Sequence, residues 1–319
     1  MRPSEPSDPR PIPPRGATGA RTASSLTGSP PIEPPAALAR RWALLGSRAA
    51  RRGLLTFARH GRAAIRPSLE SVPARDYAPG DDPRQIDWRL CARRDELLVR
   101  PPAEPPPRRL DIVLDASRSM ALGCPPKLDL ARGLAVAAAC AALGAGWCVR
   151  LLVAADRLVF DSPVLSGVAA AARATRWLQR VEPRGGATDL RAAIEAMLRR
   201  RLRPGCVILL GDLGDPAGLP AALDLLLEAG YDPQAARVFD PREAESPPPG
   251  DVELFDVETG ARWRATITPR LAARYRRKYA EFDERLDEIC RRRRVPLARV
   301  ACDQPVALAA ERLLLAPAR

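Results

Sequence analysis

The sequence Leu-Asp-Ile-Val-Leu-Asp-Ala-Ser-Arg-Ser-Met, residues 110–120, determines the fold that we expect for this chain. It begins with a largely apolar run of the kind that a buried strand needs. Asp115, Ser117 and Ser119 then occupy alternate positions, and alternate residues of an extended chain point the same way. A carboxylate and two hydroxyls are hard ligands suited to Mg²⁺. The stretch therefore predicts a cation site with positions left for water or an outside carboxylate.

Two further oxygen side chains extend this pattern. Thr188 follows a Gly-Gly pair at an expected helix start, and Asp212 follows the apolar run 206–211. In an open α/β sheet, ligands bind at the carboxyl ends of adjacent strands, so three loops would meet at one edge. The predicted metal ligands are Asp115, Ser117, Ser119, Thr188 and Asp212.

The same pattern also has an interpretation without metal. Serine and aspartate are favoured wherever a strand turns into a helix, because their side chains cap the helix. Asp115 and Asp212 would then cap helices and bind nothing, which leaves a metal-free scaffold domain. The two interpretations differ in whether added Mg²⁺ stabilises the protein.

Strands and helices alternate along the chain from about residue 108. This order predicts an α/β fold with a doubly wound, mostly parallel sheet and helices on both faces. The expected strands are 110–114, 149–154, 206–212, 234–239 and 297–301, and the expected helices are 127–146, 168–181, 189–202, 219–230 and 305–315. Residues 157–160 are expected to pair with 149–154. A hairpin is expected at 252–267, followed by a helix that Thr268 caps.

Three parts are expected along the chain. Residues 1–35 are rich in Pro, Ser, Gly and Arg and predict a disordered tail. Residues 36–107 form an N-terminal extension, with one or two amphipathic helices before residue 60 and a rigid, exposed loop around residues 75–88. We expect Tyr77, Ile86 and Trp88 to anchor that loop. Residues 108–319 form the main α/β domain.

Composition limits the class of protein. The formal net charge of +13 comes almost wholly from arginine, but no aromatic platform accompanies it, so we do not expect nucleic acid as a partner. Seven cysteines without paired spacing fit reduced thiols and a cytoplasmic location. The longest apolar stretch, 134–147, is shorter than the roughly 20 residues that a membrane helix requires.

The oxygen pattern resembles the metal-ion-dependent adhesion site of von Willebrand factor A domains. In that family the Asp-x-Ser-x-Ser loop, a threonine and a second aspartate hold Mg²⁺ or Mn²⁺, which the resemblance assigns here to the five residues above. The string Pro-Gly-Asp-Asp-Pro-Arg-Gln-Ile-Asp-Trp, residues 79–88, is similar to the signature of one bacterial branch, the family named domain of unknown function fifty-eight. This resemblance covers about residues 50–319.

The resemblance implies a role in binding rather than catalysis. Members of this branch are typically encoded beside MoxR-type AAA+ ATPases and are thought to act as adaptors in complex maturation or stress response. In von Willebrand factor A domains the partner usually donates an Asp or Glu to the metal. The resemblance therefore implies a non-enzymatic adaptor whose partners are a MoxR-type ATPase and a client protein.

An enzyme would need groups that the sequence scarcely offers. The chain has no GxxxxGK[ST] loop, and its single histidine, His60, lies far in sequence from Ser117. Metal-assisted hydrolysis would need a general base close to the site, and three carboxylates of the signature loop could serve only if that loop folds over it. They are Asp81, Asp82 and Asp87.

Overall fold

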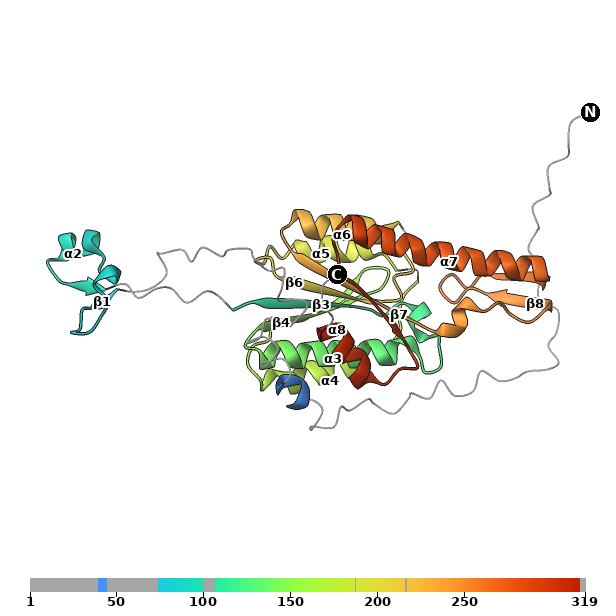
Figure 1. Cartoon of the computed structure of the whole chain (residues 1–319), viewed down its shortest axis with the longest axis horizontal. Helices are drawn as coiled ribbons and strands as arrows, with labels where there is room; N and C mark the ends of the chain where they lie inside the picture. The colour runs from blue at the N-terminus through green and yellow to red at the C-terminus, as the bar shows by residue number, and fades with distance from the viewer. Residues whose placement is uncertain (1–39, 45–73, 100–106, 187, 216, 316–319) are drawn as a thin grey trace, which may run out of the picture. The chain divides into compact units, whose positions relative to one another are not determined.

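A six-stranded, mostly parallel sheet lies at the centre of the protein, with helices on both faces (Figure 1). The computed structural model describes residues 40–44, 74–99, 107–186, 188–215 and 217–315. In spatial order the strands of the sheet are β10 (Leu297–Ala301), β7 (Asp232–Phe239), β6 (Cys206–Gly211), β3 (Arg109–Asp115), β4 (Cys148–Ala154) and β5 (Leu158–Asp161). This arrangement confirms the predicted α/β class with a mostly parallel sheet.

The strand order reverses at β3. From β3 the chain crosses to β4 on one side, and it later returns to place β6 on the other side, so β3 pairs in parallel with both. Only β5 runs antiparallel, because it follows β4 through a short turn. In the β3–β6 register Leu114 lies opposite Leu210, so the next residues, Asp115 and Gly211, end the two strands together. Reversal points of this kind form the ligand crevices of open α/β sheets.

Two separate hydrophobic clusters cover the two faces of the sheet. Leu110, Ile112 and Leu114 of β3 belong to one cluster, and Val113 belongs to the other, as the alternation of a strand requires. The first cluster includes helices α3 (Lys127–Gly144), α4 (Ala170–Gln179) and α8 (Val306–Leu315), and the second includes α5 (Leu190–Leu198), α6 (Gly218–Glu228) and α7 (Pro269–Arg292). Nearly every residue of α3 is buried, which its many alanines allow because they let neighbouring elements approach closely.

The C-terminal part adds an antiparallel arm and a long helix. Strands β8 (Gly250–Phe255) and β9 (Arg262–Ile267) form a two-stranded sheet of their own, as the expected hairpin at 252–267. Helix α7 follows, with Pro269 in its first turn and the Thr268 hydroxyl accepting a hydrogen bond from the Leu271 amide at 3.2 Å. The buried Arg237 of β7 then holds α7, because its guanidinium donates to the Tyr279 hydroxyl at 3.0 Å.

The strands and helices predicted between residues 110 and 315 are all present, with ends that differ by a few residues. The largest difference is in the helices predicted at 168–181 and 189–202, which are shorter because residues 180–186, 188–189 and 199–205 lie outside helices.

The segment from residue 74 to residue 99 is more regular than the loop that we predicted. It contains β1 (Arg75–Asp76), the 3₁₀ turn η2 (Pro83–Gln85), α2 (Trp88–Arg94) and β2 (Leu98–Val99), and β1 pairs with β2. The anchoring role expected for Trp88 is wrong within the described residues, since this residue is 65% exposed. Trp88 instead begins α2, whose first turn is capped by the Asp87 carboxylate.

Several expectations fall on residues that the structure does not describe. These are the tail at 1–35, most of the amphipathic region before residue 60, and His60; residues 40–44 are helical, with Trp42 in the first cluster. None of the described helices is both long enough and apolar enough to cross a membrane.

The cap of α7 gives a direct test of the fold. Thr268→Ala should lower the free energy of unfolding by about 1 kcal/mol, because the Leu271 amide loses its acceptor at the helix start. Urea denaturation measures this loss. Thr268→Ser keeps the acceptor oxygen and should stay close to wild type, and an equal loss in both variants would contradict the capping role.

Candidate metal centre

The candidate site starts from a buried carboxylate at the end of β3. Asp115 is 3% exposed, and its Oδ1 accepts the amide hydrogen of Ser117 at 2.8 Å. The facing position on β6 is Gly211, where a Cβ atom would lie 2.6 Å from the Cβ of Asp115. A side chain at position 211 would therefore displace Asp115, and only glycine leaves the carboxylate its place.

The two serines reach the site by different backbone conformations. Ser117 is extended, as predicted, but from Arg118 the chain forms the 3₁₀ turn η3 (Arg118–Ala121), so Ser119 does not continue the alternation. The turn nevertheless brings the two hydroxyls together, with Ser117 Oγ and Ser119 Oγ 2.9 Å apart. Arg118 is exposed, as expected for a cation between ligand positions.

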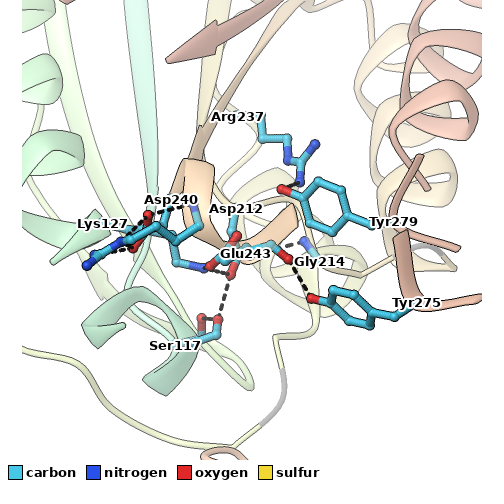
Figure 2. A network of polar contacts seen from close by, with 11 residues as sticks. Ser117, Lys127, Asp212, Gly214, Arg237, Asp240, Glu243, Tyr275 and Tyr279 are labelled. Carbon is cyan, nitrogen blue, oxygen red and sulfur yellow. Dashed lines mark hydrogen bonds and ion pairs between the residues drawn. The ribbon is translucent and has the colours of Figure 1, made fainter. Parts of the chain in front are cut away.

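Asp212 and Thr188 complete the group from two other loops. The Ser119 hydroxyl donates to Asp212 Oδ2 at 2.8 Å. The Gly214 amide donates to Asp212 Oδ1 at 3.1 Å (Figure 2). Thr188 Oγ1 lies 3.3 and 3.2 Å from the two carboxylate oxygens of Asp115. The structure thus brings together all five side chains that the sequence singled out.

Sequence reasoning missed a buried lysine at this site. The Lys127 side chain, only 4% exposed, places Nζ 3.0 Å from Asp212 Oδ2 and 2.8 Å from Glu243 Oε1 (Figure 2). Glu243 lies in the 3₁₀ turn η4 (Pro241–Ala244), and its carbonyl accepts a hydrogen bond from the Tyr275 hydroxyl of α7 at 2.5 Å. A signal was present, because Lys127 is one of two lysines in a chain that otherwise uses arginine.

The two aspartates differ in their electrostatic surroundings. Burial, and then the negative charge of Asp212, raise the pKa of Asp115 to about 7. Burial also disfavours the ionised form of Asp212, but the positive charge and hydrogen bond of Lys127 favour it, and the pKa of Asp212 is lowered. For Lys127, burial is likewise outweighed by Asp212 and Glu243, which raise its pKa. Asp212 therefore has a cationic partner, whereas the recorded contacts of Asp115 within the described residues are to neutral donors.

A third carboxylate approaches from the tip of the β8–β9 arm. Glu258 is half-buried, and its carbonyl oxygen would lie 3.9 Å from a Cβ atom added to Gly186, in the segment that leads to Thr188. Burial, together with the negative charge of Asp212, raises the pKa of Glu258. Glu258 lies within the hairpin predicted at 252–267, and no spacing in the sequence connects it with Asp115.

The donor set suits a hard divalent cation. Two carboxylates and three hydroxyls supply oxygen ligands, which Mg²⁺ prefers, and the glycine at position 211 leaves room for the Asp115 carboxylate. If such an ion binds here, Ser117, Ser119, Thr188 and the two aspartates would hold it. The described residues contain no group of three or more His, Cys, Asp or Glu side chains placed to hold a metal, so this site depends on its hydroxyls.

Metal-assisted hydrolysis would need Asp81, Asp82 or Asp87 as a general base, but each of these carboxylates contacts a partner within residues 74–99. Asp81 pairs with Arg75, with oxygen and nitrogen 2.6 Å apart, Asp82 accepts from the Arg84 amide at 3.0 Å, and Asp87 caps α2.

Comparisons with known proteins show the family. The family model described as "Protein of unknown function DUF58" matches residues 73–285. The uncharacterized proteins Mb1516 of Mycobacterium bovis and Rv1480 of Mycobacterium tuberculosis are each 33% identical over 211 residues, which is 64% of this chain and 66% of the relative. The chain thus spans slightly less than two thirds of these relatives.

Two of the solved structures to which this chain is similar come from Bacteroides. The conserved hypothetical protein BatB of Bacteroides thetaiotaomicron is 18% identical, with a TM-score of 0.43, and the match covers 63% of this chain and 93% of that one. An aerotolerance-related membrane protein of Bacteroides fragilis is also 18% identical, with a TM-score of 0.42 and coverage of 65% and 96%.

Lys127 and the other lysine form a matched pair for mutagenesis. Lys127→Met should cost about 3–5 kcal/mol in the free energy of unfolding, because it leaves buried Asp212 without its cation. Lys278→Met removes an exposed pair with Glu281 and should change stability by less than about 1 kcal/mol. Urea denaturation in chelator compares the two, and equal losses would show that Lys127 does not balance the buried charge.

Proposed function

The chain belongs to the DUF58 family of proteins of unknown function, and we propose that it is a metal-dependent adaptor that binds a protein partner through the candidate site. In this proposal Asp115, Ser117, Ser119, Thr188 and Asp212 hold Mg²⁺ or Mn²⁺. The domain would be of the von Willebrand factor A type, and its doubly wound layering of helices on a mostly parallel sheet supports this assignment.

One observation carries the proposal: the buried, unbalanced carboxylate of Asp115 among converging oxygens. A buried charge is stable only when it is paired, hydrogen-bonded or bound to a metal. Asp115 accepts hydrogen bonds from an amide and a hydroxyl, while the nearby charge of Asp212 repels it. A divalent cation would remove this repulsion and would interact with both aspartates at once.

The proposed work of the site is binding, because Asp212, the carboxylate that accepts the Ser119 hydroxyl, has a pKa lowered by Lys127 and is therefore a weak base. A cation held by five side chains can still accept an acidic side chain from a partner, and that contact would make binding metal-dependent. We propose a MoxR-type AAA+ ATPase as one partner and a client protein as the other. The seven cysteines are all free thiols, which supports a cytoplasmic setting for this role.

A metal-free scaffold is the second candidate, and Lys127 favours it. Its ammonium group already neutralises Asp212 and touches Glu243, so part of the negative charge is balanced without a divalent ion. In that case the same surface would bind its partner through hydrogen bonds and shape alone.

Thermal unfolding in chelator and in millimolar Mg²⁺ or Mn²⁺ separates the two candidates. Wild type should be stabilised by about 2.7 kcal/mol when the cation concentration is a hundred times its dissociation constant. Asp115→Asn should lose this shift but remain stable in chelator, since it removes a buried charge that has no cationic contact among the described residues. Asp303→Asn, at an exposed position, should respond to the cation as wild type does.

If the unfolding temperature of wild type is the same in chelator and in Mg²⁺ or Mn²⁺, the metal-free scaffold is the better explanation. A shift that persists in Asp115→Asn would place the cation elsewhere on the protein.

A further inference from the structure

We propose that a small apolar cavity beside the candidate cation site holds an aromatic side chain of the partner protein, while an acidic residue of the same partner segment binds the cation. This inference rests on the proposed function and specifies the chemistry of its partner. The cavity has a volume of about 250 Å³. Its apolar lining comes from β4, β5, α4 and the loops that follow β3 and α4: Ala116, Val153, Val159, Phe160, Trp177 and Val181.

Two segments of the chain belong to both the cavity and the candidate site. Ala116 lines the cavity and stands in sequence between the predicted ligands Asp115 and Ser117. Arg184 also lines the cavity, and its amide donates to the Ala116 carbonyl at 2.7 Å. The loop that carries Arg184 continues to Thr188, another predicted ligand. One short segment of a partner can therefore reach both the cation and the cavity.

An irregularity in the sheet builds one wall of the cavity. Val153 of β4 pairs with Phe160 of β5. The next pair is Ala154 with Leu158, so Val159 is the extra residue of a β-bulge. In a regular strand Val159 and Phe160 would point to opposite faces, but both line the cavity here. The bulge thus turns two consecutive apolar side chains toward one space.

The size and the walls of the cavity suit one aromatic side chain. A dry cavity of roughly 150 Å³ already accepts benzene, whereas pockets for drug-sized ligands begin at roughly 300 Å³. Phe160 and Trp177 meet edge to face with their ring centroids 5.7 Å apart, and Phe160 remains 37% exposed. A third ring can pack against this pair in the geometry that aromatic side chains prefer, and it would cover the exposed apolar surface.

The wall that α4 provides is fixed from the interior of the protein. Arg132 of α3 donates to the carbonyl oxygens of Gln179 and Val181, both at 3.2 Å. These hydrogen bonds hold the end of α4 and the start of the loop that leads to Thr188. A wall that is already in place loses little entropy when a partner binds.

The charges around the cavity favour an acidic partner. Arg180 and Arg184 are exposed where they line the cavity, and the carboxylate of Glu182 lies with them. Two more exposed arginines lie on the neighbouring loops, Arg118 in η3 and Arg157 between β4 and β5. These positive charges attract an acidic segment toward the site.

Saturation-transfer difference NMR of two short peptides tests the cavity. Acetyl-Gly-Asp-Gly-Phe-Gly-amide and acetyl-Gly-Phe-Gly-Asp-Gly-amide carry one carboxylate and one phenyl ring in the two possible orders. In millimolar Mg²⁺ we expect the full chain to transfer saturation to the ring protons of one or both peptides. Peptides with Asn in place of Asp should bind about tenfold more weakly, because they lose the contact with the cation.

Two valine variants test the position of the ring. Val159→Glu places a charge in the cavity and should weaken binding of the peptides about tenfold. Val164→Glu is the matched control, because Val164 is 44% exposed and does not line the cavity. It should bind the peptides as wild type does.

Two arginine variants give a second test that leaves β5 untouched. Arg180→Gln removes an exposed charge at the cavity and should weaken binding about threefold at low salt. Arg199→Gln removes an exposed charge after α5 and should leave binding unchanged. If Val159→Glu does not fold, this second comparison decides the question.

The outcomes separate this inference from the proposed function. If the ring signal is equal in wild type and in folded Val159→Glu, or if wild type gives no ring signal with either peptide, the inference about the cavity is wrong. A rise of the unfolding temperature in Mg²⁺ would then still support the cation site. If the ring signal depends on Val159 but is the same in chelator and in Mg²⁺, joint binding of ring and carboxylate is wrong. If Mg²⁺ also leaves the unfolding temperature unchanged, the proposed function fails as well.

Discussion

The parallel pairing of β3 with β6 is the constraint on which the site depends. It brings Asp115 and Gly211 to the same level at the point where the strand order reverses, and it places Asp212 one residue further on. The negative charges of two aspartates at the ends of neighbouring strands repel each other. The absence of a side chain at Gly211 lets Asp115 occupy the space between the strand ends, and the surrounding loops then supply hydroxyls to both carboxylates.

The balance of charge at this edge explains the choice of lysine at position 127. The ammonium group is a compact charge with three donors on a flexible chain, and here it reaches one oxygen each of Asp212 and Glu243. A planar guanidinium prefers to bind one carboxylate with two parallel hydrogen bonds, as Arg150 does with Asp161. Nearly all basic residues of this chain are arginine, and the contact shared between Asp212 and Glu243 explains why position 127 is a lysine.

The sequence was sufficient for the sheet, its helices and the choice of five oxygen side chains that meet at one edge of the sheet, because each depends on a local pattern. Apolar runs mark the buried strands, and the polar residues that follow them lie at the strand ends whatever the details of packing. It did not predict how Ser119 reaches the other four side chains, because its position comes from a 3₁₀ turn rather than from strand alternation. Glu243 and Glu258 come from segments that reach the site only through tertiary structure, so no spacing in the sequence connects them with Asp115. Trp88 shows the opposite error, since a large aromatic residue suggested an anchor and the structure exposes it.

The site also joins helix α7 to the sheet through opposite charges. Lys127 holds Glu243, whose carbonyl accepts the Tyr275 hydroxyl of α7, and Arg237 binds Tyr279 one turn further along the same helix. The β8–β9 arm precedes α7 in the chain and is joined to it at Thr268. The connection through Glu243 is complete within the protein, because a cation and a carboxylate already meet there, so the contacts of α7 do not need a bound divalent ion.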